Sequence, residues 1–435
     1  MPNYQLEYQE KLKTPKDAVS SIVSGQTIVY GIGSAQPPAL LKAISNRVRE
    51  DGVTDLEMFS FLSTEVAYKS VISPDLCTDI QSSSWFVSRS DRGLVKFGLN
   101  YFIPSYLHQI PRLCTEFMKV DVALAMVSPM DSSGFFSLGI GNDYISTAAR
   151  SAKILLLEVN KHMPRVFGDS CIHISEVDAV LENHLLLPEI AYGKVKPEDD
   201  VVGKLIADLI PNGATLQLGI GNLPNAVGRA LVNHKDIGIH TELMTPTMID
   251  LIKCGVINGQ KKNLHPRKHI FTTASGTHSM YEFMDNNPSF ESYPASYVCS
   301  PKVISLNDKM VAVNAVLEFD LLGQCNAEFL DGSQWSGTGG QLDFVRGAFD
   351  SKGGIGILTC HSSAKGATVS RIVPRFKEGT PVTVPRADVQ FLATEYGVVD
   401  VKGKSTKDRA LGIISLAHPN FRDQLMAEAE QMALF

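Results

Sequence analysis

A single glutamate at the end of an apolar run is the first candidate for covalent chemistry in this sequence. Glu242 follows Gly238-Ile-His-Thr, and one helix-sized stretch separates this segment from the turn Gly219-Ile-Gly-Asn-Leu-Pro224. That spacing predicts two strand ends lying side by side. A carboxylate placed there is able to act as a nucleophile, although a lone glutamate after a strand is more often a surface or helix-capping residue. His240 is likewise more often a hydrogen-bonded structural histidine than a base.

Two glycine-rich segments are candidates for binding negative charge. One is the turn from Gly219 to Leu223, and the other is Gly337-Thr-Gly-Gly340. Backbone N–H groups at a helix N-terminus or in a glycine nest are able to hold an anion or an oxyanion. The alternative is that these glycines only permit a positive φ in a tight turn. No third glycine completes a dinucleotide fingerprint and no Walker lysine follows, so a dehydrogenase or a P-loop enzyme is disfavoured.

Further polar residues follow two later apolar strands. Lys365, Ser370 and Arg371 are candidates for contacting phosphates, and the alternative is a solvated loop. Glu395 comes directly after an apolar strand, which places a second carboxylate where ligands bind in α/β proteins. The alternative for Glu395 is a helix cap or a solvated loop residue. The histidines do not have metal-ligand spacing, and GxSxG and HExxH motifs are missing, so we predict no metal site.

The elements that must position these residues occur twice. Residues 14–44 and 202–231 each contain an amphipathic helix, Gly-x-Thr, a short apolar strand, Gly-Ile-Gly and a proline that opens a second helix. Two copies of this pattern predict two related α/β domains. Two prolines, a glycine and a charge run mark a boundary within Leu187–Asp200, which gives domains 1–190 and 191–435.

Alternating strand and helix patterns predict an α/β fold in which mostly parallel sheets are flanked by helices. The buried-strand candidates are residues 120–128, 152–159, 310–319, 354–360 and 389–394.

Composition restricts the partners and the compartment. The 435 residues carry a net charge of −6, so the basic field that nucleic-acid binding needs is missing. The seven cysteines form no CxxC pair, which favours reduced thiols in a cytoplasm. The N-terminal segment is polar and the apolar runs are short, so we expect a cytoplasmic protein without a signal peptide or membrane span.

The ordered motifs resemble, along nearly the whole chain, the acetyl-CoA hydrolase/transferase family, most closely its 4-hydroxybutyrate CoA-transferase branch. The motifs are Val159-Asn-Lys-His-Met-Pro-Arg-Val-Phe-Gly168, Gly219-Ile-Gly-Asn-Leu223, Gly238-Ile-His-Thr-Glu242, Phe271-Thr-Thr-Ala-Ser-Gly276, Asp320-Leu-Leu-Gly-Gln-Cys-Asn326, Gly337-Thr-Gly-Gly-Gln-Leu-Asp-Phe344, Thr394-Glu-Tyr-Gly397 and Ala417-His-Pro-Asn-Phe421.

This resemblance implies two related domains of the sugar-phosphate-isomerase type with the active site between them. It implies that Glu242 forms a glutamyl-CoA thioester and that Glu395 helps to place the acceptor carboxylate. Coenzyme A or acyl-CoA is then a substrate, no prosthetic group is needed, and a homo-oligomer, a dimer or tetramer, is expected. The residues implied to contact CoA or its thioester are Gly219, Ile220, Gly221, Asn222, Leu223, Gly339 and Gly340, with Lys365 added as a phosphate contact.

Two departures from the family pattern bear on acyl-chain preference. Thr245-Pro-Thr247 stands where the family often has an Asp-Gly pair, and Cys299-Ser-Pro301 stands where relatives often have Asn-Asp-Pro. Two other functions stay open on the residues. One is an acyl-CoA hydrolase that uses the same intermediate with water as acceptor. The other is a non-catalytic ligand sensor, which normally carries a DNA-binding helix pair and a basic surface.

Overall fold

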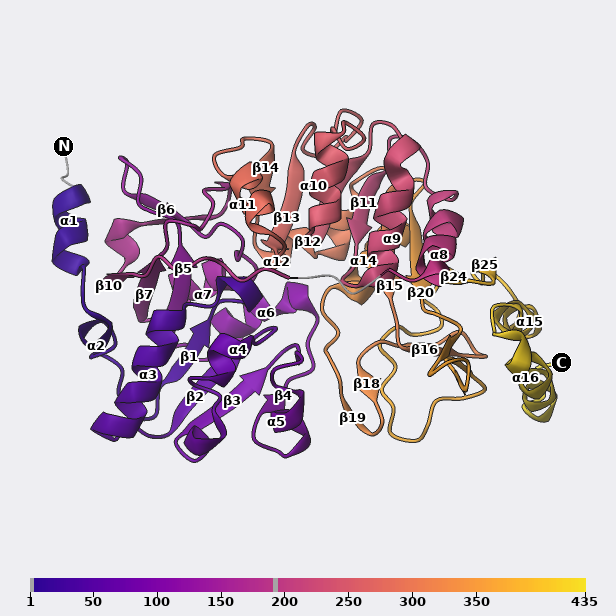
Figure 1. Cartoon of the computed structure of the whole chain (residues 1–435), viewed down its shortest axis with the longest axis horizontal. Coiled ribbons are helices and arrows are strands. Elements are labelled where there is room, and N and C mark those ends of the chain that lie inside the picture. The colour runs from indigo at the N-terminus through magenta and orange to yellow at the C-terminus, as the bar shows by residue number, and fades with distance from the viewer. Residues whose placement is uncertain (1–3, 191–194) are drawn as a thin grey trace.

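The chain forms two large sheets side by side, one in each half, together with smaller ones (Figure 1). The computed structural model describes residues 4–190 and 195–435. The first sheet is fully parallel, with strand order β10-β7-β5-β1-β2-β3-β4. Its strands are β1 (Thr27–Tyr30), β2 (Leu56–Ser60), β3 (Ile80–Ser84), β4 (Tyr101–Phe102), β5 (Val122–Val127), β7 (Ile154–Val159) and β10 (Ala179–Glu182).

The second sheet has nine strands in the order β25-β24-β20-β15-β11-β12-β13-β14-β8, and only the β24–β25 pair is antiparallel. Its strands are β8 (Phe167–Gly168), β11 (Thr215–Leu218), β12 (Gly238–Met244), β13 (His269–Ala274), β14 (Phe290–Ser292), β15 (Met310–Ala315), β20 (Ile355–Thr359), β24 (Phe391–Thr394) and β25 (Gly397–Asp400). The parallel sheets predicted from the sequence are confirmed, and each of the five predicted strand segments contains a strand.

Helices and short hairpins complete both halves. The first half contains α1 (Tyr4–Lys11), α2 (Pro15–Ala18), α3 (Pro38–Asp51), α4 (Glu65–Tyr68), α5 (Arg92–Lys96), α6 (Ile110–Arg112) and α7 (Ile145–Ser151). The second half contains α8 (Pro197–Ala207), α9 (Asn222–Ala230), α10 (Pro246–Lys253), α11 (His278–Met284), α12 (Ala295–Val298), α13 (Pro301–Ser305), α14 (Gln341–Asp350), α15 (Thr406–Ser415) and α16 (Pro419–Gln431). The hairpins that matter below are β18 (Phe329–Leu330) with β19 (Ser333–Gln334), and β21 (Ser363–Ala364) with β22 (Val369–Ser370).

The internal repeat corresponds to the centre of each sheet. β1 lies between β2 and β5, and β11 lies in the same way between β12 and β15. In both halves the chain first adds strands on one side of the central strand and then returns to add strands on the other. In the second sheet, the order in which strands are added therefore reverses between β11 and β15. At such a switch point an open α/β sheet forms a ligand crevice beyond the carboxyl ends of its strands.

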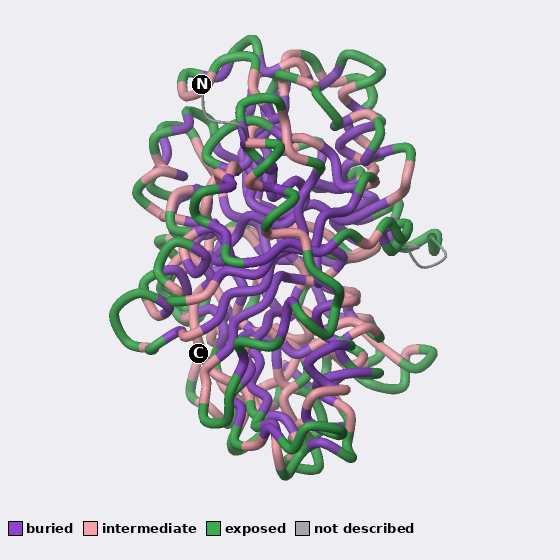
Figure 2. Tube along the Cα trace, turned by 90° about the vertical axis from the view of Figure 1, so that its left-hand side faces the viewer, coloured by how far each residue is buried: buried purple, intermediate pink, exposed green. Residues whose placement is uncertain are grey.

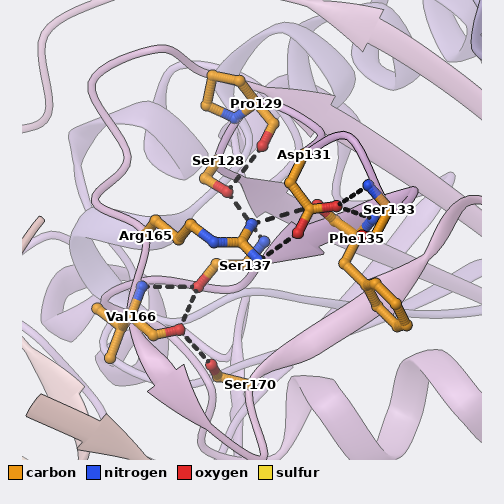
Figure 3. Close-up of polar contacts among 9 residues, drawn as sticks. All are labelled: Ser128, Pro129, Asp131, Ser133, Phe135, Ser137, Arg165, Val166 and Ser170. Atoms are coloured by element: carbon orange, nitrogen blue, oxygen red, sulfur yellow. Dashed lines mark hydrogen bonds and ion pairs between the residues drawn. The ribbon is translucent and has the colours of Figure 1, made fainter. Parts of the chain in front are cut away.

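One segment of the first half crosses into the second sheet. β8 pairs in parallel with β14, and a Cβ on Gly168 would lie 2.5 Å from Ser292 O, so a glycine suits this close approach. Figure 3 shows how the preceding turn is held: the Arg165 guanidinium lies 2.5 Å from Asp131 Oδ2, and the Val166 N–H donates to Ser137 Oγ over 3.0 Å. The motif 159–168 thus joins the two sheets.

The two halves share a continuous hydrophobic core. One cluster of buried side chains includes Val29 and Trp85 from the first half together with Ile270, Cys299 and Phe344 from the second. Figure 2 shows the buried part of the chain running through the middle of the molecule. The expected domain boundary between residues 190 and 191 falls at the start of residues 191–194, which are outside the described residues. Among the described helices, none combines the length and apolar character needed to span a membrane.

Candidate active site

A cavity of about 110 Å³ opens at the switch point of the second sheet. It is bounded by the ends of β11 and β15, the last part of β12 and the loop before α14, with Phe86 from the first half. The lining residues are Phe86, Gln217, Leu218, Gly219, Ile220, Glu242, Leu243, Asn314, Ala315, Ala327, Ser336, Gly337, Thr338, Gly339, Gly340 and Gln341. The cavity therefore brings together Glu242 and both glycine segments that the sequence singled out.

Glu242 lies inside β12, two residues before the strand ends, and not after the strand as its position in the apolar run indicated. Its side chain is half-buried. The Gly340 N–H donates a 2.8 Å hydrogen bond to Glu242 Oε2. β12 pairs with β11 only through Gly238 and Ile239, so the neighbouring space at Glu242 is left for the cavity.

The carboxylate of Glu242 is held in conditions that disfavour its charge. Burial raises the pKa of Glu242 to about 7, the charge of Asp343 acts in the same direction, and the Gly340 N–H opposes both. Gly340 caps the N-terminus of α14, where backbone N–H groups favour negative charge. A partly desolvated carboxylate near neutrality is a more reactive nucleophile than a fully hydrated one.

The loop that carries Gly340 is held by the first half of the chain. The Leu107 N–H donates to Gly339 O over 3.1 Å, and the Val87 N–H donates to Ser336 O over 3.3 Å. A Cβ on Gly337 would lie 2.6 Å from Trp85 O, so only a glycine allows this approach. Sequence reasoning did not identify these first-half contacts, and no motif marks them.

The Gly219 turn comes directly before α9, and Gly219 and Ile220 line the cavity, whereas Gly221, Asn222 and Leu223 do not. The Gly219 N–H donates to Val313 O over 2.8 Å, and Gly221 has a φ of 123°, a conformation for which glycine is suited. Within the described residues, the backbone N–H groups of Ile220 and Gly221 donate no hydrogen bond. Leu223 is buried, whereas Ile220 is 48% exposed. Asn222 begins α9.

Two paired amide side chains, from β11 and β15, line the cavity. Gln217 and Asn314 exchange two side-chain hydrogen bonds of 3.0 Å each, and both residues are buried. A Cβ on Gly219 would lie 2.7 Å from Asn314 Oδ1. Neither residue was predicted from the sequence, although both are polar residues near the carboxyl end of an inner strand.

The corresponding turn of the first half has a different environment. Gly31 and Ile32 are buried, and Ser34 Oγ lies 3.0 Å from Ser275 Oγ of the second half. The Gly31 N–H donates to Leu124 O, and the Gly33 N–H donates to Phe61 O over 3.4 Å. The first copy therefore packs between the halves, and none of its glycines lines the Glu242 cavity.

Glu395 and Lys365 lie outside this cavity. Glu395 occupies the turn between β24 and β25 and accepts hydrogen bonds from Ser362, at 2.9 Å from the backbone N–H and 2.6 Å from the hydroxyl. Lys365 is exposed in the β21–β22 hairpin with a φ of 50°. Within the described residues, the structure does not bring either side chain against Glu242.

His240 has the structural role that its residue type favours. Its ring is buried, its Nε2 lies 2.8 Å from Val298 O as a donor, and burial lowers its pKa to about 3. His240 is therefore neutral and is not a base for Glu242.

The two departures from the family pattern lie at different distances from the site. Cys299 is buried next to the Gly340 loop. A Cβ on Gly340 would lie 3.4 Å from the Cys299 Sγ. Thr247 lies at the start of α10, and its hydroxyl donates to Asn225 of α9 over 3.1 Å. Cys299 thus adjoins the candidate nucleophile, whereas Thr247 supports the neighbouring helix.

The chain shares its whole length with known proteins. Residues 1–188 match the acetyl-CoA hydrolase/transferase N-terminal domain, and residues 276–429 match the C-terminal domain. The chain is 40% identical to 4-hydroxybutyrate coenzyme A transferase of Clostridium kluyveri, with 97% of each chain covered. It is 39% identical to succinyl-CoA:cyclohexane-1-carboxylate CoA transferase of Geobacter metallireducens, covering 99% of this chain and 97% of that one. The solved structure of RipA from Yersinia pestis covers 100% of both chains at 45% identity, with a TM-score of 0.97.

Two related α/β sheets, a carboxylate at the switch point and full-length CoA-transferase relatives define an enzyme of the acyl-CoA:carboxylate CoA-transferase class. The chain belongs to the acetyl-CoA hydrolase/transferase family, as its motifs predicted.

Proposed function

We propose that this protein transfers coenzyme A between a short-chain acyl-CoA, such as 4-hydroxybutyryl-, butyryl- or acetyl-CoA, and a free carboxylate such as acetate, through a glutamyl-CoA thioester on Glu242. The observation that carries this proposal is the position of the Glu242 carboxylate, half-buried at the switch point and bonded to the Gly340 N–H at 2.8 Å.

The proposed reaction conserves the thioester energy, so it needs no ATP. The Glu242 carboxylate attacks the acyl-CoA carbonyl and displaces the CoA thiolate, which leaves a mixed anhydride. The thiolate then attacks the glutamyl carbonyl of the anhydride, and the first acid leaves as its carboxylate. The second acid repeats these two steps in reverse. A carboxylate is a weak nucleophile, so binding energy from the distant part of CoA must support the attack.

The two glycine segments suit two different oxyanions. The Gly340 N–H already faces a Glu242 oxygen, so it is placed to stabilise the oxyanion that forms when the thiolate attacks the glutamyl carbonyl. From the other glycine segment, Ile220 lines the cavity, and its N–H group suits the oxyanion of the acyl group. Glu395 and Lys365 stay predictions as acceptor-placing and phosphate-contacting residues, and both would act from outside the cavity.

The acid pair is tested with a matrix of substrates. Acetyl-, butyryl- and 4-hydroxybutyryl-CoA are each incubated with acetate, butyrate, succinate and cyclohexane-1-carboxylate, and new acyl-CoA is measured by mass. We expect exchange with at least one short-chain pair and little CoA release when no acid is added. CoA release that is equally fast without an acceptor would instead support the hydrolase alternative.

The pH dependence of exchange follows from the state of the nucleophile. Glu242 must be ionised to attack, and burial raises its pKa to about 7. We therefore expect kcat/KM to be constant at high pH and to fall about tenfold per pH unit well below pH 7. The measurement is kcat/KM for the best acyl-CoA between about pH 4 and 9. An acid limb near the ordinary glutamate value of 4.5 would show that the carboxylate is hydrated in the working enzyme.

A further inference from the structure

A short segment of the first half contacts both the glycine loop and the helix that follows it. Tyr106 pairs with Gly339 in a parallel bridge, and the Leu107 N–H donates to Gly339 O. The next residue, His108, places its Nδ1 2.9 Å from Asp343 Oδ1, which is within ion-pair distance, although the contact does not have hydrogen-bond geometry. Asp343 lies three residues after Gly340, in the first turn of α14. Residues 106–108 therefore contact two neighbours of the nucleophile: Gly339 in the glycine loop and the carboxylate of Asp343.

Asp343 is a second buried carboxylate beside Glu242. Its side chain is 4% exposed, and its Oδ2 has no hydrogen-bond partner within the described residues. Burial raises the pKa of Asp343, and contact with His108 opposes this effect. The charge of Asp343 in turn disfavours ionisation of Glu242. Two carboxylates close together resist being ionised at the same time unless a proton donor offsets one of them.

The charges of two basic side chains, His108 and Arg346, favour the ionised form of Asp343, and His108 is the one within ion-pair distance. Arg346, on the next turn of α14, forms an ion pair with Asp388 at 2.9 Å. Cys299 adjoins Glu242 as a buried thiol that its surroundings keep protonated. Within the described residues, His108 is the basic side chain within ion-pair distance of Asp343. The Tyr106 ring lies parallel to that of His108, with ring centroids 6.2 Å apart and an interplanar angle of 8°.

We propose that His108 is a positioning residue that the first half supplies to the site: a proton on its Nδ1 offsets the Asp343 carboxylate and so leaves Glu242 free to be the ionised nucleophile. This inference rests on the proposed function, because it assumes that Glu242 is the nucleophile. It assigns to the contact between the halves a chemical role in addition to packing. It also predicts that His108 acts only through Asp343.

The test compares four variants by the pH profile of kcat/KM and of glutamyl-CoA formation in a single turnover. His108→Ala removes the proton donor, and His108→Asn keeps an N–H close to the position of Nδ1. Asp343→Asn removes the charge at nearly constant shape, and the fourth variant combines His108→Ala with Asp343→Asn.

His108→Ala should move the acid limb to higher pH, so that kcat/KM at pH 6, relative to its own plateau, falls by roughly three- to tenfold. His108→Asn should restore most of the loss. Asp343→Asn should leave the limb in place or move it to lower pH, and the double variant should behave like Asp343→Asn.

Three outcomes would overturn the proposal. An unshifted limb in His108→Ala would leave the contact as packing only. A double variant as impaired as His108→Ala would show that His108 acts without Asp343. If His108→Ala does not fold, a limb that moves to higher pH in Asp343→Asn would contradict the proposal by sign. A wild-type enzyme that forms no covalent adduct would refute the proposed function itself, and this result is distinct from an adduct whose pH profile ignores His108.

Discussion

Glu242→Gln should abolish CoA exchange, with a loss of roughly four orders of magnitude or more, because the side chain supplies the covalent bond and not only binding. Incubating the wild type with acyl-CoA and no acceptor acid should leave CoA attached to the peptide that contains Glu242. The mass of the intact protein and of that peptide checks both statements. Hydroxylamine should release the label, because it cleaves thioesters.

The same variant should remain folded, and at alkaline pH it should be more stable than the wild type. The folded-state pKa of Glu242 is raised to about 7 from an ordinary value of 4.5, so ionising this group in the folded protein is unfavourable above that range. The penalty is fully present above about pH 7 and disappears below about pH 4.5. Glu242→Gln should therefore raise Tm at pH 8 and leave it nearly unchanged at pH 4.

The control for this experiment is to measure CoA exchange and Tm on the same sample of the variant. An inactive Glu242→Gln that melts at or above the wild-type temperature at pH 8 excludes misfolding as the cause. Label on another residue, or substantial exchange by the variant, would refute the assignment of Glu242.

Gly340→Ala is expected to lower turnover by roughly 10²–10³ while Tm falls by only a few degrees. The backbone at Gly340 has a φ of −95°, which alanine adopts without strain. The added Cβ would collide with Glu242 Oε2, and the side chain of Glu242 must then move away from the N–H that it bonds. Because the atom in the way is the far end of a flexible side chain, the variant should alter the nucleophile more than the fold. Steady-state rates and thermal melting measure the two effects.

Gly33→Ala is the matched control in the first copy of the repeat. Gly33 has a φ of 46°, and its Cβ would approach nothing closer than Leu62 O at 4.0 Å. The change should therefore cost about 1 kcal/mol in stability through backbone strain, with turnover maintained. Equal rate losses at Gly33 and Gly340 in folded protein would mean that both turns serve the site. Normal turnover in Gly340→Ala would mean that its N–H is not used.

Local patterns in the sequence were sufficient for the strands, the duplication and the parallel sheets. Residues 122–127 are apolar throughout, and residues 154–159 are apolar except for Glu158, because both faces of a parallel sheet are covered; this pattern is visible without a structure. The repeat around Gly31 and Gly219 likewise indicated two related α/β domains, whereas the inner position of its strands in each sheet was seen only in the structure. Composition alone did not distinguish Glu242 from a surface or capping glutamate. The resemblance to a family indicated Glu242 as the nucleophile.

The tertiary structure alone decided which of these residues meet. Gly340 and Glu242 are 98 positions apart, and His108 and Asp343 come from different halves, so no spacing rule connects them. The exchange of β8 into the second sheet and the separation of Glu395 from Glu242 also depend on how the two halves pack. Periodicity reports which face of an element is buried, whereas contacts between distant segments depend on the docking of two sheets, which local sequence does not encode.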